Sequence, residues 1–241
     1  MDNAFRTYAL LKEEVKRWQA ERGPFWLDWL SPVKFPPGYT IKDLPEKAVM
    51  ELWQRLNEVS NLSVSDSILW EMWEDFINSQ PVTNKELFSR LQMAICGVAG
   101  FWRESILKLK TDWDTVEQRD YAGQGITCPI CGELAGVSIL SPPNGRRYLH
   151  CLLCGHEWLA KRVGCLRCGN EEAANLNYLN SEDYPGVEII VCQTCGQYAK
   201  EYDLRVRNVE DIEWETIRTL SLDYAAEKWL AVHMQLLGKA H

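Results

Sequence analysis

The sequence lacks several features that mark common classes of protein. No apolar run approaches the ~18 residues that a membrane-spanning helix needs, and charges interrupt the first residues, where a secretory signal peptide would be apolar. Basic residues are in the minority, with 26 Lys and Arg against 34 Asp and Glu. These absences argue against a membrane span, export and general polyanion binding, and they predict a cytoplasmic protein.

Catalytic motifs are absent as well. The sequence contains no Gly-rich phosphate loop and no nucleophile-elbow pattern. Isolated acids such as Asp75, Asp120 and Glu157 have no neighbouring partner in the sequence that would indicate acid–base catalysis. We therefore predict that the protein is not an enzyme.

Cysteine, in contrast, is frequent in this sequence. Nine cysteines occur in 241 residues, and eight of them form four CxxC pairs, each followed by glycine. Two residues between cysteines let a tight turn direct both thiolates at one metal ion, and the glycine suits a turn position of positive φ. The ninth, Cys96, falls on a predicted helix, where we expect a buried small apolar residue.

Tetrahedral metal sites take four thiolates, so eight cysteines predict two sites. The 19 residues between Cys131 and Cys151 and the 23 between Cys168 and Cys192 are close to zinc-ribbon spacing, whereas the 10 after Cys154 suggest a connection. Interleaved pairing stays open, although it demands longer chain crossings. Sequential pairing predicts one metal site from Cys128, Cys131, Cys151 and Cys154, and another from Cys165, Cys168, Cys192 and Cys195.

Other uses of these cysteines fit less well. A disulfide framework conflicts with the absence of export signals, because the cytosol keeps thiols reduced. His150 and His156 flank one pair, but with four cysteines available we expect them to have a structural or hydrogen-bonding role. Closed tetrathiolate sites are the prediction, and zinc and iron both accept this geometry.

The rest of the sequence predicts an α+β protein with four parts. Residues 1–122 read as a helical domain, residues 126–160 and 161–205 as two metal ribbons, and residues 208–238 as a C-terminal helix. Apolar periodicity predicts the first helix over 4–22, ended by Gly23-Pro24. Further helices are expected from Pro45, over 65–78, and from a capping sequence at 83–86 to about residue 110. Short strands are expected at 136–140, 147–151, 157–163, 175–180 and 187–192, after a glycine hinge at 121–125.

The charge and the aromatic residues of the sequence indicate which kinds of partner the protein can bind. The ribbon region, residues 126–205, carries seven Lys and Arg against nine Asp and Glu, which argues against nucleic acid as a ligand. Eight of the eleven tryptophans precede residue 126, where we expect most to be core residues and the segment 25–30 to contribute to a docking surface.

The residues around the cysteines resemble a known family, the formate dehydrogenase accessory proteins of the FdhE type. The resemblance lies in Cys128-Pro-x-Cys-Gly, in Arg147-Tyr-Leu-His-Cys151 with Glu157-Trp158, in Arg162-x-x-Cys165 and in Cys192-x-x-Cys195-Gly-x-Tyr198. The stretch from Thr219 to Glu227 is also similar to the family's final helix.

This resemblance implies an α-helical domain followed by two rubredoxin-like ribbons that hold zinc or iron. It also implies a cytoplasmic, non-catalytic maturation factor that binds the formate dehydrogenase catalytic subunit. Two other functions stay open: an iron–thiolate redox or thiol-sensing protein, and a zinc-ribbon protein that binds nucleic acid. Homodimer formation is also left open by the sequence.

Overall fold

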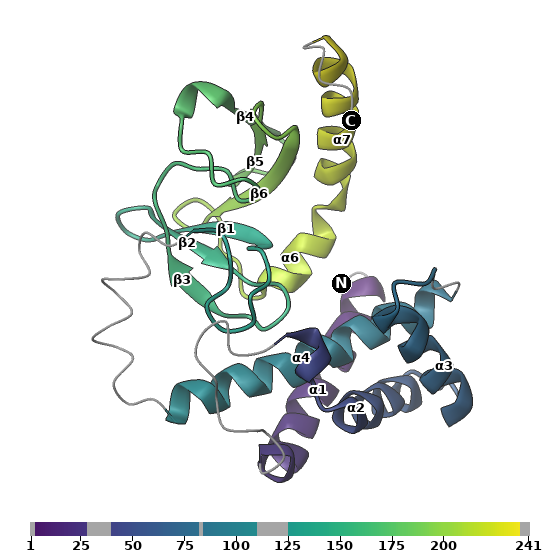
Figure 1. Cartoon of the computed structure of the whole chain (residues 1–241). Coiled ribbons are helices and arrows are strands. Elements are labelled where there is room, and N and C mark those ends of the chain that lie inside the picture. The colour runs from purple at the N-terminus through teal and green to yellow at the C-terminus, as the bar shows by residue number, and fades with distance from the viewer. Residues whose placement is uncertain (1–2, 28–39, 82–83, 110–124, 237–241) are drawn as a thin grey trace. The chain divides into compact units, whose positions relative to one another are not determined.

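The computed structural model describes residues 3–27, 40–81, 84–109 and 125–236. The chain divides into two compact units, one mainly helical and one built around a sheet, and each is described by itself (Figure 1). Residues 121–124 of the hinge predicted at 121–125 and the proline-rich segment after Leu27 lie outside the described residues. The boundaries predicted for the four parts stay a prediction.

The helical unit contains four α-helices and a short 3-10 helix in the described residues. They are α1 (Asn3–Leu27), the 3-10 helix η1 (Ile41–Asp43), α2 (Glu46–Val59), α3 (Asp66–Ile77) and α4 (Lys85–Leu109). The side chain of Asn84 caps α4 by accepting a hydrogen bond from the backbone N–H of Leu87 at 3.1 Å. The predicted helices are thus present, in the predicted order.

Tryptophan side chains form much of this unit's core. Trp18 and Trp53 are completely buried, and each indole N–H finds a partner: Glu51 at 3.1 Å for Trp18 and the Leu87 carbonyl at 3.0 Å for Trp53. Helices α1, α2 and α4 meet where Gly97 leaves no room for a side chain. A Cβ added there would lie 2.8 Å from Leu52 Cδ2 and 2.9 Å from a Val15 methyl carbon.

Two predictions for the helical unit need correction. The first helix does not end at Gly23-Pro24 but includes Pro24 and continues to Leu27. Proline removes one N–H from the helix, yet Trp26 in the following turn is only 7% exposed, and its packing holds that turn helical. Cys96 is half-buried on α4 rather than buried as predicted.

The second unit contains a six-stranded sheet in the order β3-β2-β1-β6-β5-β4. Neighbouring strands are antiparallel except for β1 and β6 at its centre, which pair in parallel with Val137 opposite Lys200. Each ribbon therefore contributes three strands to one continuous sheet. The strands are β1 (Val137–Ser141), β2 (Arg146–His150), β3 (Glu157–Leu159), β4 (Leu176–Asn180), β5 (Val187–Cys192) and β6 (Gln197–Asp203).

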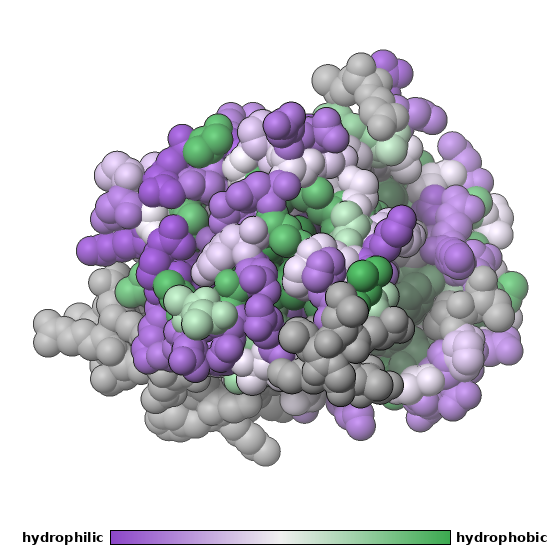
Figure 2. Space-filling view, turned by 90° about the horizontal axis from the view of Figure 1, so that it is seen from above, coloured by the Kyte–Doolittle hydropathy of each residue, from purple (hydrophilic) through white to green (hydrophobic). Residues whose placement is uncertain are grey.

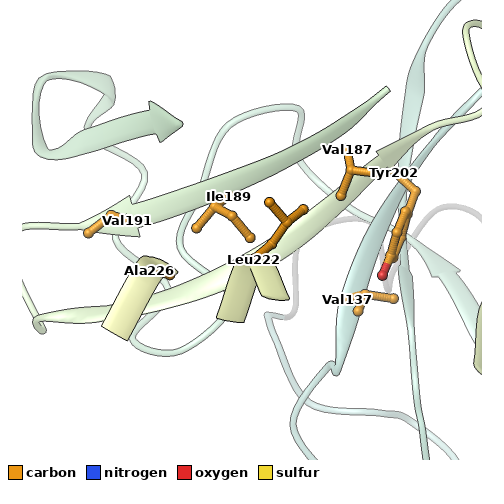
Figure 3. Close-up of a cluster of buried hydrophobic side chains, with 7 residues drawn as sticks. All are labelled: Val137, Val187, Ile189, Val191, Tyr202, Leu222 and Ala226. Atoms are coloured by element: carbon orange, nitrogen blue, oxygen red, sulfur yellow. The ribbon is translucent and has the colours of Figure 1, made fainter. Parts of the chain in front are cut away.

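The C-terminal helices pack on one face of this sheet. Leu222 and Ala226 of α7 (Leu220–Leu236) belong to one cluster with apolar side chains that alternate along the strands (Figure 3). Alternation along β1, β5 and β6 turns these residues to the same face, because successive strand residues point to opposite sides. The buried members of this cluster are Val137, Val187, Ile189, Val191, Tyr202, Leu222 and Ala226.

The structure differs from the sequence prediction in two elements of this unit. Strand β6 was not predicted, although it is central in the sheet. The single helix predicted over 208–238 is two helices, α6 (Ile212–Arg218) and α7, which are separated at Thr219. The predicted α+β class, with N-terminal helices, metal ribbons and a C-terminal helical element, is confirmed.

Polar and apolar side chains are mixed on the part of the surface that Figure 2 shows. On the face seen in Figure 2, hydrophobic side chains lie in separate groups among hydrophilic ones. None of the helices in the described residues combines the length and the apolar character that crossing a bilayer requires.

Candidate metal centres

All four CxxC pairs form the same kind of tight turn. The backbone N–H of the first cysteine donates to the carbonyl five residues later: Cys128 to Glu133 at 2.7 Å, Cys151 to His156 at 2.9 Å and Cys165 to Asn170 at 2.8 Å. In the fourth turn, Cys192 and Gln197 are partners at the ends of β5 and β6. This closure places both sulfurs of a pair on one side of the turn.

The glycine after each pair has the predicted positive φ. The values are +75° at Gly132, +68° at Gly155, +73° at Gly169 and +68° at Gly196. Side chains make this conformation costly, so glycine is the residue that lets the chain turn back toward the first cysteine. Four short sequence motifs therefore encode four equivalent turns.

The turns bring the eight sulfurs into two groups of four. In each group all sulfur atoms lie within 4.8 Å of one another. The first cluster contains Cys128, Cys131, Cys151 and Cys154, and the second contains Cys165, Cys168, Cys192 and Cys195. These are the two sets predicted by sequential pairing, and none of the nine cysteines forms a disulfide.

The sulfur spacing fits a tetrahedral metal ion. In the second cluster the Sγ atoms of Cys165 and Cys195 are 3.7 Å apart, and those of Cys168 and Cys192 are 3.8 Å apart. Four sulfurs at about 2.3 Å from a central zinc ion would be about 3.8 Å from one another. A disulfide would need about 2.05 Å. The donor set and the spacing both fit a tetrathiolate site.

Burial and the backbone N–H groups shift the pKa of the cysteine thiols in opposite directions. Burial raises the pKa of the Cys195 thiol, and the neighbouring sulfur of Cys165 raises it further. Burial also acts to raise the pKa of Cys192, but the N–H groups of Cys195 and Thr194 lower it below the ordinary value. Gathering four thiolates is costly without a cation, and a bound metal ion removes that cost.

The two clusters differ in their exposure. All four cysteines of the first cluster are buried, whereas Cys168 is exposed and Cys195 is half-buried in the second. Leu176 and Ile190 of the sheet cover the inner side of the second cluster, against Cys165 and Cys192. The first cluster is therefore closed, and the second is open to solvent on one side.

Neither flanking histidine is part of a cluster. His150 Nδ1 lies 3.0 Å from Glu157 Oε1, across the β2–β3 pair, and His156 stacks on Trp158 with ring centroids 6.0 Å apart. Both histidines therefore contribute to the structure of the first ribbon next to its cysteines.

The sequence did not predict the side chain that ties the second cluster to the sheet. Arg147 of β2 donates from Nη1 to the carbonyl of Gly164, the residue before Cys165, at 2.9 Å. The backbone N–H of Arg167, inside the CxxC turn, donates to the sulfur of Cys165 at 3.3 Å. Only the tertiary arrangement shows that Arg147, from the first ribbon, supports the second.

The fold and the two clusters define a class of protein: a helical unit combined with two tetrathiolate ribbons that share one sheet. Residues 127–162 match the family model described as "FdhE, central domain". This range contains the complete first cluster. The resemblance to the FdhE family predicted from the cysteine motifs is thus confirmed.

Individual relatives agree with this family. A protein named "Protein FdhE homolog" from Aquifex aeolicus is 36% identical over 116 residues, which are 46% of this chain and 41% of the relative. Its namesake from Shewanella oneidensis is 32% identical over 139 residues, 56% of this chain and 43% of the relative. The chain therefore spans less than half the length of these curated relatives.

The fold agrees with a solved structure. The crystal structure of the FdhE protein from Pseudomonas aeruginosa superposes with a TM-score of 0.60, over 90% of this chain and 82% of that one. At 18% sequence identity, this similarity concerns the fold alone.

Proposed function

We propose that this protein is a cytoplasmic accessory factor that binds the catalytic subunit of formate dehydrogenase during its maturation. The observation that supports this function best is the FdhE match at 127–162, because it covers the turns and strands that build the first cluster. In this proposal the chain has no catalytic activity of its own, and the eight clustered cysteines are metal ligands.

Each cluster would hold one zinc or iron ion, and the ion would act as a structural cross-link. Strands of three to seven residues bury too little apolar surface to order a ribbon alone, and metal ligation supplies that stability in small domains. The cross-linked turns would present a rigid surface to the partner. Rigidity reduces the entropy lost on binding, which favours capture of an unfinished subunit.

Co-purification from the native cell with metal analysis tests this function. We expect the tagged full chain to retain the formate dehydrogenase catalytic subunit. The double variant Cys165→Ala/Cys168→Ala should lose that capture, because it removes half of the second cluster. The control is Cys96→Ala, which removes a half-buried cysteine outside both clusters and should capture normally. Undiminished capture by the double variant would contradict the proposal.

A redox function is the second candidate, and the exposure of Cys168 favours it. An iron ion in the second cluster would exchange electrons through this solvent-facing sulfur, whereas the buried first cluster lacks such access. The visible spectrum of anaerobically purified protein separates the two functions. A reversible iron–thiolate band would support redox chemistry, and colourless protein with full zinc occupancy would exclude it.

A further inference from the structure

A cavity of about 460 Å³ lies in the sheet unit, on the face covered by α6 and α7. Its floor includes Val137 of β1 and Lys200 of β6, the two parallel central strands. Leu134, which follows one turn of the first cluster, and Leu152, which lies inside the other, also line the cavity, as does Arg167 inside a turn of the second cluster. The cavity therefore exists only because both ribbons join one sheet, and its size is typical of ligand sites.

The lining of the cavity includes apolar side chains and an ion pair between buried Lys200 and half-buried Asp223. Leu134 is 45% exposed, so its side chain is accessible from solvent. The Lys200 ammonium is 2.7 Å from Asp223 Oδ2 and also donates to Thr219 Oγ1 at 3.1 Å. Lys200 and Asp223 neutralise each other, so neither supplies a net charge to a ligand.

Arg167 is the remaining charged residue that lines the cavity. Its Nε and Nη1 groups donate to the carbonyls of Tyr198 and Ala135, each at a long distance of 3.4 Å. Among the described residues no carboxylate forms an ion pair with Arg167. A guanidinium has five N–H donors, so most of its hydrogen-bonding capacity is still available. The cavity thus combines apolar side chains with one cation that no carboxylate of the described residues pairs with.

We propose that this cavity binds an apolar peptide segment of a partner protein through a carboxylate, with Arg167 as the group that recognises it. Arginine pairs with carboxylates through two parallel N–H donors, and the low local dielectric of a half-enclosed site strengthens that contact. Leu134, Leu152 and Leu230 would contact apolar side chains beside the carboxylate. That the segment belongs to a formate dehydrogenase subunit rests on the proposed function, whereas the ligand chemistry does not.

Titration of the full metal-loaded chain with three acetylated peptides, followed by ¹H–¹⁵N NMR, tests the proposal. The probes are Leu-Leu-Phe with a free C-terminal carboxylate, the same peptide as an amide, and Leu-Glu-Phe amide. At least one carboxylate peptide should bind about tenfold more tightly than the neutral amide. The shifts should include the amides of Arg167, Tyr198 and Asp223. The tighter of the two carboxylate peptides shows whether a chain terminus or an acidic side chain is preferred.

Variants of Arg167 test whether this residue recognises the carboxylate. Arg167→Gln should abolish the preference for the carboxylate, and Arg167→Lys should keep most of it. Arg146→Gln, which changes an exposed arginine outside the cavity, should behave as the wild type. An unchanged preference in Arg167→Gln, equal affinity for all three peptides, or no saturable binding would overturn the proposal. Acetate binding as tightly as the peptides would also overturn it, since the site would then serve free small acids.

Because these titrations contain no dehydrogenase, their outcome is separate from that of the capture experiment. A chain that captures the subunit but shows no preference for carboxylates would refute the cavity assignment alone. A chain that prefers carboxylates but captures no subunit would refute the proposed function alone.

Discussion

Charged side chains lie at the centre of the sheet, and each one has a partner there. Arg147 and Glu201 are both only 2% exposed, with Arg147 Nε 2.7 Å from Glu201 Oε2. Arg147 also donates from Nη2 to Ser138 Oγ at 3.2 Å. The same carboxylate accepts from Ser138 Oγ at 2.8 Å, and its other oxygen lies 3.4 Å from Arg162. Glu201 thereby connects strands of both ribbons.

Removing this carboxylate charge should destabilise the protein strongly. Glu201→Gln leaves the buried Arg147 guanidinium without its counter-charge, which costs about 3–5 kcal/mol in comparable cases. Chemical denaturation of the metal-loaded protein measures the loss as a lower midpoint. The control is Glu171→Gln, which breaks an exposed pair with Lys161 and should cost less than about 1 kcal/mol. Equal losses in the two variants would refute this role of Glu201.

A tyrosine of strand β6 in the same sheet should resist ionisation. Burial raises the pKa of Tyr198 to about 12, and the neighbouring Asp223 carboxylate adds to the effect. The neutral phenol is therefore favoured by folding. Its contribution to stability is complete below the ordinary pKa of about 10 and is lost as pH rises through 12. Absorbance titration at 295 nm should show a tyrosine component near pH 12 that Tyr198→Phe removes. An unchanged titration curve in that variant would contradict the assignment.

At the scale of elements, close helix packing depends on one glycine of α4. Gly97→Ala would push a methyl group into Leu52 and Val15, and overpacking of this kind costs about 1–3 kcal/mol. Gly100→Ala is the matched control on the same helix, where the nearest atoms would be 3.8 Å away. Because alanine favours helix by roughly 1 kcal/mol over glycine, the control should be neutral or stabilising. Thermal unfolding that lowers Tm equally in both variants would contradict the packing account.

The cysteine turns were predictable because their information is local. Two intervening residues and a glycine define each turn, and the gaps between pairs favour sequential grouping. The helices of the first unit were predictable for the same reason, since apolar residues recur at helical spacing. No local pattern, however, marks Arg147 as the link to the second ribbon.

Strand β6 and the break at Thr219 depend on long-range contacts instead. The strand carries Lys200 and Glu201, which obscure its apolar alternation, and both are buried because Asp223 and Arg147 pair with them. Thr219 ends α6 by donating to the Glu215 carbonyl at 2.7 Å while it accepts from Lys200. Lys200, Asp223 and Arg147 make these contacts across long stretches of sequence, so periodicity alone could not reveal either feature.

At the scale of the whole molecule, the parallel pairing of β1 and β6 has the largest consequence. It converts two ribbons into one sheet, gives Glu201 partners from both, and forms the cavity that contains Arg167. Loss of metal from one cluster should therefore also destabilise the other ribbon, since the two ribbons share one sheet and the buried ion pair of Arg147 with Glu201.

Native mass spectrometry of the full chain measures whether each cluster holds one metal ion. We expect a main species with two metal ions per chain, and a species with one when Cys165 and Cys168 are both replaced by alanine. We also expect that wild type denatured with a chelator at neutral pH exposes nine thiols to an alkylating agent, the eight of the clusters and Cys96. A metal-free native chain, or one whose clustered cysteines are joined as disulfides, would contradict the account.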